Sequence, residues 1–394
     1  MRLAKIILPL ILSITTVFTN VTPLHPANEV PQNVATTTDE AALDISAKAG
    51  YLIEATTGTV LYSKNPEQSC AIASVTKVMT LLLVMEAIES GTIKLEDKVM
   101  ISKKAASMGG SQVYLEEGES ISVEELIKCA VIASANDASA ALAELVGGSE
   151  SSFVKKMNEK AEQLSLVNTY FENTTGLDDT TTNHHSCARD VAVISRELIK
   201  HPLILKYSSI WQDSIRDGEM VLTNTNRLIR YYEGCNGLKT GSTDKAGFCI
   251  SVTAKRQNMQ LIAVVLGAST KDDRNADART LLDFGFANFS LFESAEAYLE
   301  KAYVKNGKES YCDLYKNGFS CVVDKAKARK IEEIYEIPEH LSAPVKAGDV
   351  VGKITYQIDG EKIGEAEIYA KYDIAKINAI DVFLRLIRKI IVGA

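Results

Sequence analysis

The sequence predicts an α/β (α+β) fold: an antiparallel sheet with helices on both faces and an all-helical insertion, then a small β-sandwich domain and a C-terminal amphipathic helix. Strand-like runs lie at both ends of residues 44–290, helical runs lie between them, and short alternating runs fill residues 291–374. The 394 residues are 46% hydrophobic and 24% charged, with a net charge of −8. This composition excludes a disordered or collagen-like chain, and no nucleic acid partner is expected.

The N-terminal segment has the pattern of a secretory signal. Arg2 and Lys5 precede an uncharged run from Ile6 to Phe18, which is too short for a confident membrane span. We assign residues 1–27 to a signal peptide and leader and residues 28–43 to a linker. A buried N-terminal strand is the alternative. The sequence therefore predicts an exported protein.

Residues 44–290 form the predicted first domain. Strands are expected at Gly50–Glu54, Phe248–Ala254 and Gln260–Gly267, and a helical run extends from Val75 to Glu89 before Gly91. Because the strands lie at the two ends of the domain with helices between them, we expect one antiparallel sheet assembled from both ends.

Residues 291–374 form the predicted second domain, which is rich in β-strands. Apolar side chains alternate from Ile354 to Ile358, and a second alternating run follows from Ile363 to Ala370. Asp359-Gly360 separates the two runs and is a typical two-residue hairpin turn.

Residues 375–394 form the predicted amphipathic helix. The apolar residues at helical spacing are Ile377, Ile380, Phe383, Leu384, Ile387 and Ile391. The cations are Lys376, Arg385, Arg388 and Lys389. We expect this helix to lie in the membrane interface, attracted by anionic lipid, since the interspersed cations argue against a spanning helix. A helix docked on its own domain is the alternative.

The seven cysteines indicate no disulfide framework, because their number is odd. Cys312 and Cys321 flank a turn-like Asn317-Gly318 and could face each other across a hairpin, although free buried thiols fit as well. His184, His185 and Cys187 lack a second ligand pair, so no metal site is expected.

Three short motifs carry the chemistry: Ser74-Val75-Thr76-Lys77, Ser134-Ala135-Asn136 and Lys239-Thr240-Gly241. Ser74 is expected to open the apolar helix, and Ser134-Asn136 to lie in a turn between helical runs. Lys239-Thr240-Gly241 is expected to precede a strand. The first two patterns also occur elsewhere in the chain, so their order and context matter more than any single match.

Ser74 and Lys77 share one helix face, because they are three residues apart. A serine hydroxyl needs a base, and Lys77 can be that base only without its proton. Burial and a nearby Lys239 would lower the pKa of Lys77 as required. The alternative is a helix-capping serine beside a surface lysine.

These motifs together resemble the serine D-Ala-D-Ala carboxypeptidases, the low-molecular-mass penicillin-binding proteins. Further stretches that resemble the family are Phe171–Leu177, His184–Asp190, Asn224-Thr225-Asn226 and Asp244–Phe248. The resemblance extends from about Ala49 to Phe292. Ile72, Cys187 and Cys235 depart from the residues that many relatives have, and they put the local loop geometry in doubt.

The resemblance implies catalytic roles by matching motif. Ser74 would be the acylated nucleophile, Lys77 its general base, and Ser134 the relay that passes the proton to the leaving group. The backbone N–H groups of Ser74 and Ser242 would form the oxyanion hole.

The same resemblance implies substrate-binding roles. Asn136 would hold an amide of the substrate. Lys239, Thr240 and Arg274 would bind the terminal carboxylate of the peptide, since charge-assisted hydrogen bonds select a chain end over an internal amide. The family implies no cofactor and no metal.

The implied function is removal of the terminal D-alanine from the stem pentapeptide of peptidoglycan, through an acyl-enzyme at Ser74. β-Lactams would be covalent inhibitors at the same serine. The implied location is the outer face of the cytoplasmic membrane, with the C-terminal helix bound to lipid.

Two other functions remain open from the sequence. A class A β-lactamase would share the serine and both lysines, but it needs a Glu-x-x-x-Asn for rapid deacylation, and only Asp179 to Asn183 has that spacing. A non-catalytic sensor of muropeptides or β-lactams is the second alternative, although a receptor would not need a relay serine.

Overall fold

The structure is a computed structural model that describes residues 43–179 and 181–392. The predicted signal peptide and leader, residues 1–27, lie outside the described residues, as does the predicted linker except for residue 43.

The first domain contains one five-stranded antiparallel sheet. Its strands, in spatial order, are β2 (Val60–Lys64), β1 (Ala49–Glu54), β9 (Met259–Ala268), β8 (Gly247–Arg256) and β7 (Cys235–Thr243). Strands from the two ends of the domain thus pair directly, β1 with β9. The predicted antiparallel sheet is confirmed.

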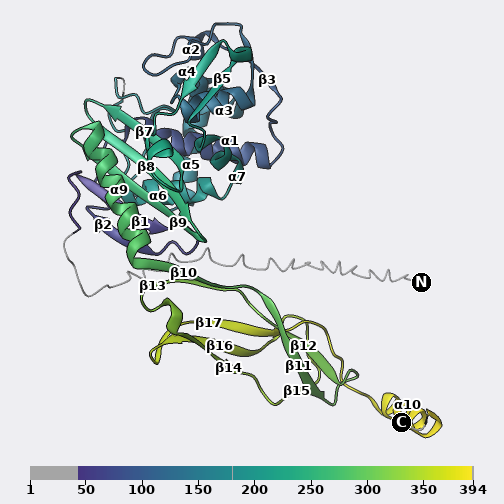
Figure 1. Ribbon diagram of the computed structural model, residues 1–394. Helices are drawn as coiled ribbons and strands as arrows, with labels where there is room; N and C mark the ends of the chain where they lie inside the picture. Colours follow the sequence, from purple (N-terminus) through teal and green to yellow (C-terminus); the bar gives the residue numbers. More distant parts are fainter. Residues whose placement is uncertain (1–42, 180, 393–394) are drawn as a thin grey trace, which may run out of the picture. The chain divides into compact units, whose positions relative to one another are not determined.

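Helices cover both faces of this sheet (Figure 1). Leu52 and Ala263 belong to the core under α9 (Lys271–Asn288), whereas Ile53 and Val264 belong to the core under α6 (Ala188–Ile199). Successive strand residues point to opposite faces, so both faces of the central strands are apolar.

The helical insertion lies between β2 and β7. Its helices are α1 (Lys77–Glu89), α2 (Lys103–Ala106), α3 (Val123–Ile132), α4 (Asn136–Gly147), α5 (Glu150–Gln163), α6, α7 (Pro202–Ser208) and α8 (Leu228–Tyr231). Short hairpins join them, β3 (Lys98–Met100) with β4 (Ser120–Ser122) and β5 (Gln212–Ile215) with β6 (Met220–Thr223), and the 3₁₀ turn η2 (Arg216–Gly218) lies between β5 and β6.

Two local expectations need correction or addition. Ser74 does not open the α-helix itself: it lies in a 3₁₀ turn, η1 (Ala73–Thr76), after which α1 begins at Lys77. Ala73 has a left-handed φ of 45°, which sets the turn apart from the preceding chain. Lys239-Thr240-Gly241 precedes a strand, β8, as expected, but the motif also lies within a strand of its own, β7, which was not expected. Its polar residues hide the strand pattern, since their burial depends on η1 packing against β7.

The second domain has two sheets. The smaller one pairs β10 (Phe289–Ser294) with β13 (Phe319–Asp324). The larger one has six strands in the order β14 (Ile331–Glu336), β16 (Val350–Ile358), β17 (Glu361–Ala370), β12 (Tyr311–Lys316), β11 (Ala297–Lys305) and β15 (His340–Ser342). A 3₁₀ turn, η3 (Ala328–Lys330), precedes β14. Only the β11–β15 pair in this sheet is parallel.

The core of the second domain confirms the alternation read from the sequence. Ile354 and Tyr356 are fully buried, and Asp359-Gly360 joins β16 to β17. Phe319 of the smaller sheet stacks on Tyr356, with ring centroids 4.5 Å apart. Cys312 pairs with Ala302, whereas Cys321 pairs with Phe292 on the other sheet. The two cysteines therefore do not face each other across a hairpin, and the cysteines are free thiols.

The last helix, α10, spans Ala379–Val392. Asn378 caps it: its side-chain oxygen accepts from the Asp381 backbone N–H at 2.9 Å, and the Asp381 carboxylate accepts from the Asn378 N–H at 3.1 Å. Within residues 43–179 and 181–392, no helix has the length and apolar character needed to cross a bilayer.

Candidate active site

Ser74 and Lys77 lie together at the start of α1. The Ser74 hydroxyl oxygen is 2.9 Å from Nζ of Lys77, and Ser74 is half-buried while Lys77 is fully buried. The 3₁₀ turn leads directly into α1, so the two side chains stay one turn apart on a single face. A nucleophile and a base therefore lie at hydrogen-bond distance.

The surroundings of Lys77 favour its neutral form. Burial is the main cause that holds the pKa of Lys77 well below its usual range, and the positive charge of Lys239 lowers it further. Nζ donates to Oδ1 of Asn136 at 2.6 Å and to the Thr175 carbonyl at 3.1 Å. A neutral amine has two N–H donors, which these two acceptors use. Its lone pair is then left for the Ser74 hydroxyl.

The second motif lies in the turn between α3 and α4, as predicted. Ser134 is buried and has a left-handed φ of 63°, a conformation that costs a non-glycine residue about 1 kcal/mol or more. Asn136 begins α4 and donates through its side-chain amide to the Gly109 carbonyl at 2.7 Å. In the described residues Lys77 Nζ bonds to Asn136 and not to Ser134. The relay role of Ser134 stays a prediction.

Two buried cations, Lys239 and Arg274, lie beside the pair of Ser74 and Lys77. Neither has a carboxylate partner in the described part of the chain. Lys239 donates only to the Thr240 carbonyl, at 2.8 Å, and burial together with Arg274 lowers the pKa of Lys239 to about 7. Arg274, on α9, donates to Oδ1 of Asn275, and burial lowers its pKa to about 10. Buried cations normally have anionic partners, so this pair is suited to an anion from outside the chain.

Strand β7 approaches the nucleophile through Gly241. A Cβ atom built on Gly241 would lie 2.6 Å from the backbone N of Ser74 and 3.0 Å from the carbonyl oxygen of Ile72. Only glycine therefore fits at this contact between β7 and η1. Ser242, the next residue, is exposed, and Thr240 donates to the Thr225 hydroxyl at 2.8 Å. Ser242 therefore directly follows the residue of β7 that approaches the backbone N of Ser74.

His184 is a residue at the site that sequence reasoning missed. Its Nδ1 accepts from the Glu172 N–H at 3.1 Å, so its Nε2 carries the hydrogen and donates to the Thr76 hydroxyl at 2.8 Å. Burial lowers the pKa of His184 to about 4, which keeps the ring neutral. The ring thus ties residues 171–177, which supply the Thr175 carbonyl, to the turn that carries Ser74. The sequence showed only a family-like stretch there.

Residues 109–119, which contact Asn136, are held by Asp137 and by Arg216. The sequence predicted no role for these two residues. The buried Asp137 carboxylate accepts from the N–H groups of Val113 and Leu115, at 3.0 and 3.1 Å. Arg216 donates to the Val113 carbonyl at 3.0 Å and to the Glu119 carboxylate at 2.8 Å. These contacts fix residues 109–119, whose Ser111 carbonyl accepts from the Asn136 N–H.

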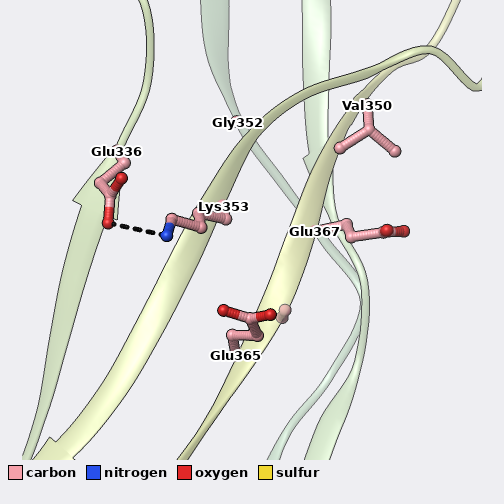
Figure 2. Close-up of a pocket in the computed structure, with 7 residues that line it drawn as sticks. Glu336, Val350, Gly352, Lys353, Glu365 and Glu367 are labelled. Atoms are coloured by element: carbon pink, nitrogen blue, oxygen red, sulfur yellow. Dashed lines mark ion pairs between the residues drawn. The ribbon is translucent and has the colours of Figure 1, made fainter. Parts of the chain in front are cut away.

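A hollow lies on the second domain, on the outer face of β14, β16 and β17 (Figure 2). Lys353 forms an ion pair with Glu336 at 3.3 Å, and Glu365 and Glu367 line the same hollow. Its lining contains no serine, cysteine or histidine.

Comparison with known proteins agrees with this geometry. The D-alanyl-D-alanine carboxypeptidase family profile matches residues 34–270, and a profile for the C-terminal domain of penicillin-binding protein 5 matches residues 286–376. D-alanyl-D-alanine carboxypeptidase DacF of Bacillus subtilis is 43% identical over 342 residues, which are 85% of this chain and 87% of that protein. DacA of Haemophilus influenzae is 32% identical over 84% of this chain and 86% of its own.

Solved structures show the same relationship. Penicillin-binding protein 5 from Haemophilus influenzae has a TM-score of 0.74 and 32% identity, covering 84% of this chain and 98% of that one. Penicillin-binding protein D2 from Listeria monocytogenes, in its ampicillin-bound form, has a TM-score of 0.57 and 32% identity, covering 61% of this chain and 98% of that one. The first profile alone matches more than half of the chain, and the chain belongs to the D-alanyl-D-alanine carboxypeptidase family.

Proposed function

We propose that this protein is a serine D-Ala-D-Ala carboxypeptidase that removes the terminal D-alanine from the stem pentapeptide of peptidoglycan. The observation that carries the proposal is the 2.9 Å distance between the Ser74 hydroxyl and the fully buried Lys77 amine. Family membership supports the reaction, and the geometry supports the assignment of these two residues.

Acylation begins when the Ser74 oxygen attacks the carbonyl carbon of the penultimate D-alanine. The hydroxyl proton passes to Lys77 Nζ, which is neutral because burial and Lys239 disfavour its charge. The C–N bond then breaks, and the departing amine takes up a proton. We propose that Ser134 relays that proton, as the resemblance of the Ser134-Ala135-Asn136 motif implies. D-Alanine leaves, and the peptide remains as an ester on Ser74.

Deacylation returns the enzyme to its starting state. A water molecule adds to the ester carbon, with Lys77 accepting the proton of the water. The Ser74 oxygen leaves and is reprotonated, which releases the shortened stem. In both steps the negative oxygen of the intermediate accepts from the N–H groups of Ser74 and Ser242.

The terminal carboxylate of the peptide is proposed to bind Lys239 and Arg274. Both cations are buried and lack a carboxylate partner in the described residues, so an incoming carboxylate would gain strong charge-assisted hydrogen bonds. Thr240, buried next to Lys239, adds a hydroxyl. This arrangement favours a chain end over an internal peptide bond.

β-Lactams should acylate the same serine, because their ring amide and carboxylate resemble the D-Ala-D-Ala end. A Listeria relative has been solved with ampicillin bound. The class A β-lactamase alternative has less support, since Asp179 and Asn183 are exposed rather than directed to a buried water site.

The direct test is mass spectrometry after penicillin treatment, together with an assay of D-alanine released from a pentapeptide. We expect one modified peptide, containing Ser74, and loss of D-alanine release in Ser74→Ala. Modification at Ser152 or Ser242 would contradict the assignment. Rapid penicillin turnover would support a β-lactamase, and no release from the wild type would support a sensor.

We also propose that the chain is exported and attached to the outer face of the cytoplasmic membrane through α10. The support is the signal-like N-terminal sequence and the exposure of the apolar side of α10, where Ile390 and Ile391 are 82% and 76% exposed. We expect the protein in the membrane fraction, with Phe383→Glu and Leu384→Glu together releasing it. Retention of this double variant in the membrane fraction would contradict attachment through α10.

A further inference from the structure

One end of the six-stranded sheet is joined to the segment that leads into α10. Residues 306–310, here called the hairpin tip, connect β11 to β12. The Lys308 N–H donates to the Ala375 carbonyl and the Ile377 N–H donates to the Asn306 carbonyl, both at 2.8 Å. The hairpin tip and the start of the helical segment therefore lie side by side.

The hairpin tip holds α10 by its polar side. Arg385 donates to the Gly307 carbonyl at 3.1 Å and also to the Lys308 carbonyl, and Lys308 forms an ion pair with Asp381 at 3.2 Å. The large apolar residues of α10 that are exposed are Ile380, Val382, Phe383, Leu384, Leu386, Ile390 and Ile391. A helix docked for its own burial would turn its apolar side inward, so this arrangement leaves the apolar side for another partner.

Two exposed tyrosines lie beside the hairpin tip. Tyr303 and Tyr311 face each other across β11 and β12, with ring centroids 5.9 Å apart, and they are 50% and 60% exposed. Their strand neighbours Val304 and Cys312 point into the core. The two rings are therefore not part of the domain core, and amphipathic aromatic rings of this kind favour the boundary between lipid and water.

Charges of both signs lie at the same end of the sheet. The exposed lysines are Lys305, Lys308, Lys346 and Lys376, and the exposed carboxylates are Glu309, Asp349 and Asp373. Lys308 pairs with Asp381, whereas Lys305, Lys346 and Lys376 have no carboxylate partner within 4 Å in the described residues. These three lysines can therefore bind anionic groups of an external partner such as lipid phosphates.

We propose that the hairpin tip, with Tyr303 and Tyr311, forms a second contact with an anionic lipid bilayer, beside the contact made by α10. This inference rests on the proposed membrane attachment. The rings would sit at the headgroup level while the lysines meet lipid phosphates. The β-domain would then touch the bilayer itself, and α10 would not act as a separate tether.

The same sheet face offers a matched control. Tyr298 and Tyr315 also face each other across β11 and β12, with ring centroids 5.7 Å apart, and Tyr298 is 49% exposed. Tyr315 lies four residues beyond Tyr311, which is about 13 Å at the rise of a strand. This pair is also two facing tyrosines, but it lies farther from the hairpin tip, and Tyr315 is half-buried beside Tyr369 and Lys371.

The test measures partition of the full chain onto vesicles of phosphatidylglycerol and phosphatidylcholine. Tyr303→Ser with Tyr311→Ser should lower the partition coefficient roughly fivefold to tenfold, because two interfacial rings are lost. Tyr298→Ser with Tyr315→Ser should change it less than about twofold. All chains keep the same N-terminus, so these differences report on the changed side chains, and urea unfolding of each variant checks that the second domain stays folded.

A second readout places the contact directly. Tyr303→Trp and Tyr298→Trp are compared for quenching by brominated lipids, with Trp211 as a constant background in both. We expect added quenching at position 303 only. Equal effects of the two tyrosine pairs, or no quenching at position 303, would overturn the inference while leaving attachment by α10 intact. Failure of the wild type to bind vesicles would overturn the proposed attachment and this inference together.

Discussion

The two domains bury different kinds of side chain. The first domain buries Lys77, Lys239 and Arg274 together with many hydroxyls and amides, whereas the buried side-chain oxygens after residue 290 in the described part are those of Ser294 and Tyr356. The core of the second domain is built from residues such as Leu314, Ile354 and Tyr356. One domain therefore carries unpaired charge in its interior, and the other carries almost none.

This difference separates the sources of stability from the sources of chemistry. A buried cation without an anionic partner destabilises the folded state, so its presence indicates a function that stability alone does not explain. The apolar second domain loses nothing in this way. Its functional groups are instead on its surface, at the hairpin tip. Replacing a buried cation of the first domain should thus lower activity and raise the free energy of unfolding. Replacing an apolar core residue of the second domain should lower the free energy of unfolding and leave activity unchanged.

The largest expected effect comes from Lys239→Met compared with Ile354→Ala. Lys239→Met removes a buried cation whose amine bonds only to the Thr240 carbonyl. We expect kcat/KM for the peptide to fall about 10²-fold or more, because the carboxylate loses a charged partner. We expect the free energy of unfolding to rise by about 1–2 kcal/mol.

Ile354→Ala should do the reverse. It leaves a cavity at a fully buried position, so the free energy of unfolding should fall by about 2–5 kcal/mol. At a temperature where the domain stays folded, kcat/KM should be unchanged. Urea unfolding and steady-state assays of both variants check this pair. A Lys239→Met variant that is less stable than the wild type would contradict this comparison of the two interiors.

The pH dependence tests the same buried charge. Lys77 must be neutral to act as a base, and it is neutral above its lowered pKa. Lys239 must be charged to bind carboxylate, and with a pKa of about 7 it is charged below that pH. We therefore expect kcat/KM to rise and then fall with pH, with the fall above about pH 7. Lys239→Arg should remove the alkaline fall, because a guanidinium stays charged. An unchanged alkaline limb in this variant would assign the fall to another group.

Part of the site could be predicted from local spacing. Ser74 and Lys77 are three residues apart, and helical spacing alone brings them together. The strands β1, β8 and β9 also followed from continuous apolar runs. These features depend on residues that are close to one another in the sequence, so a local sequence pattern predicts them.

The remaining features depend on contacts between distant segments. Thr76 and His184 are separated by 108 positions, and no local pattern indicates their hydrogen bond. β7 was missed because Lys239 and Thr240 are polar, and their burial depends on contacts of β7 with distant segments, namely η1, α7 and α8. The apolar spacing of α10 predicted an amphipathic helix, but not which side would contact the hairpin tip.

We expect an effect of intermediate size on acylation from two substitutions of His184. They test whether the interior of the first domain positions Ser74. Glutamine can keep the donor to Thr76, and asparagine can keep the acceptor for the Glu172 N–H. If the Thr76 link positions the Ser74 turn, acylation by penicillin should fall about tenfold in His184→Asn but less than about threefold in His184→Gln.

The acylation rate, the KM and the melting temperature should be measured for both variants. A positioning role lowers the acylation rate with little change in KM. Equal losses in both variants that follow the melting temperature would show that His184 acts on stability alone.

The smallest effect is expected in the second domain, at the Tyr356 hydroxyl. This oxygen is buried and has no hydrogen-bond partner in the described residues. Tyr356→Phe keeps the ring stacked on Phe319 and removes an unsatisfied polar group, so the free energy of unfolding should change by less than about 0.5 kcal/mol or rise slightly. Chemical denaturation measures this directly. A loss above about 1 kcal/mol would show that the hydroxyl is hydrogen-bonded, with the neighbouring Ser294 side chain as the partner, and the second interior would then depend on a polar contact at Tyr356.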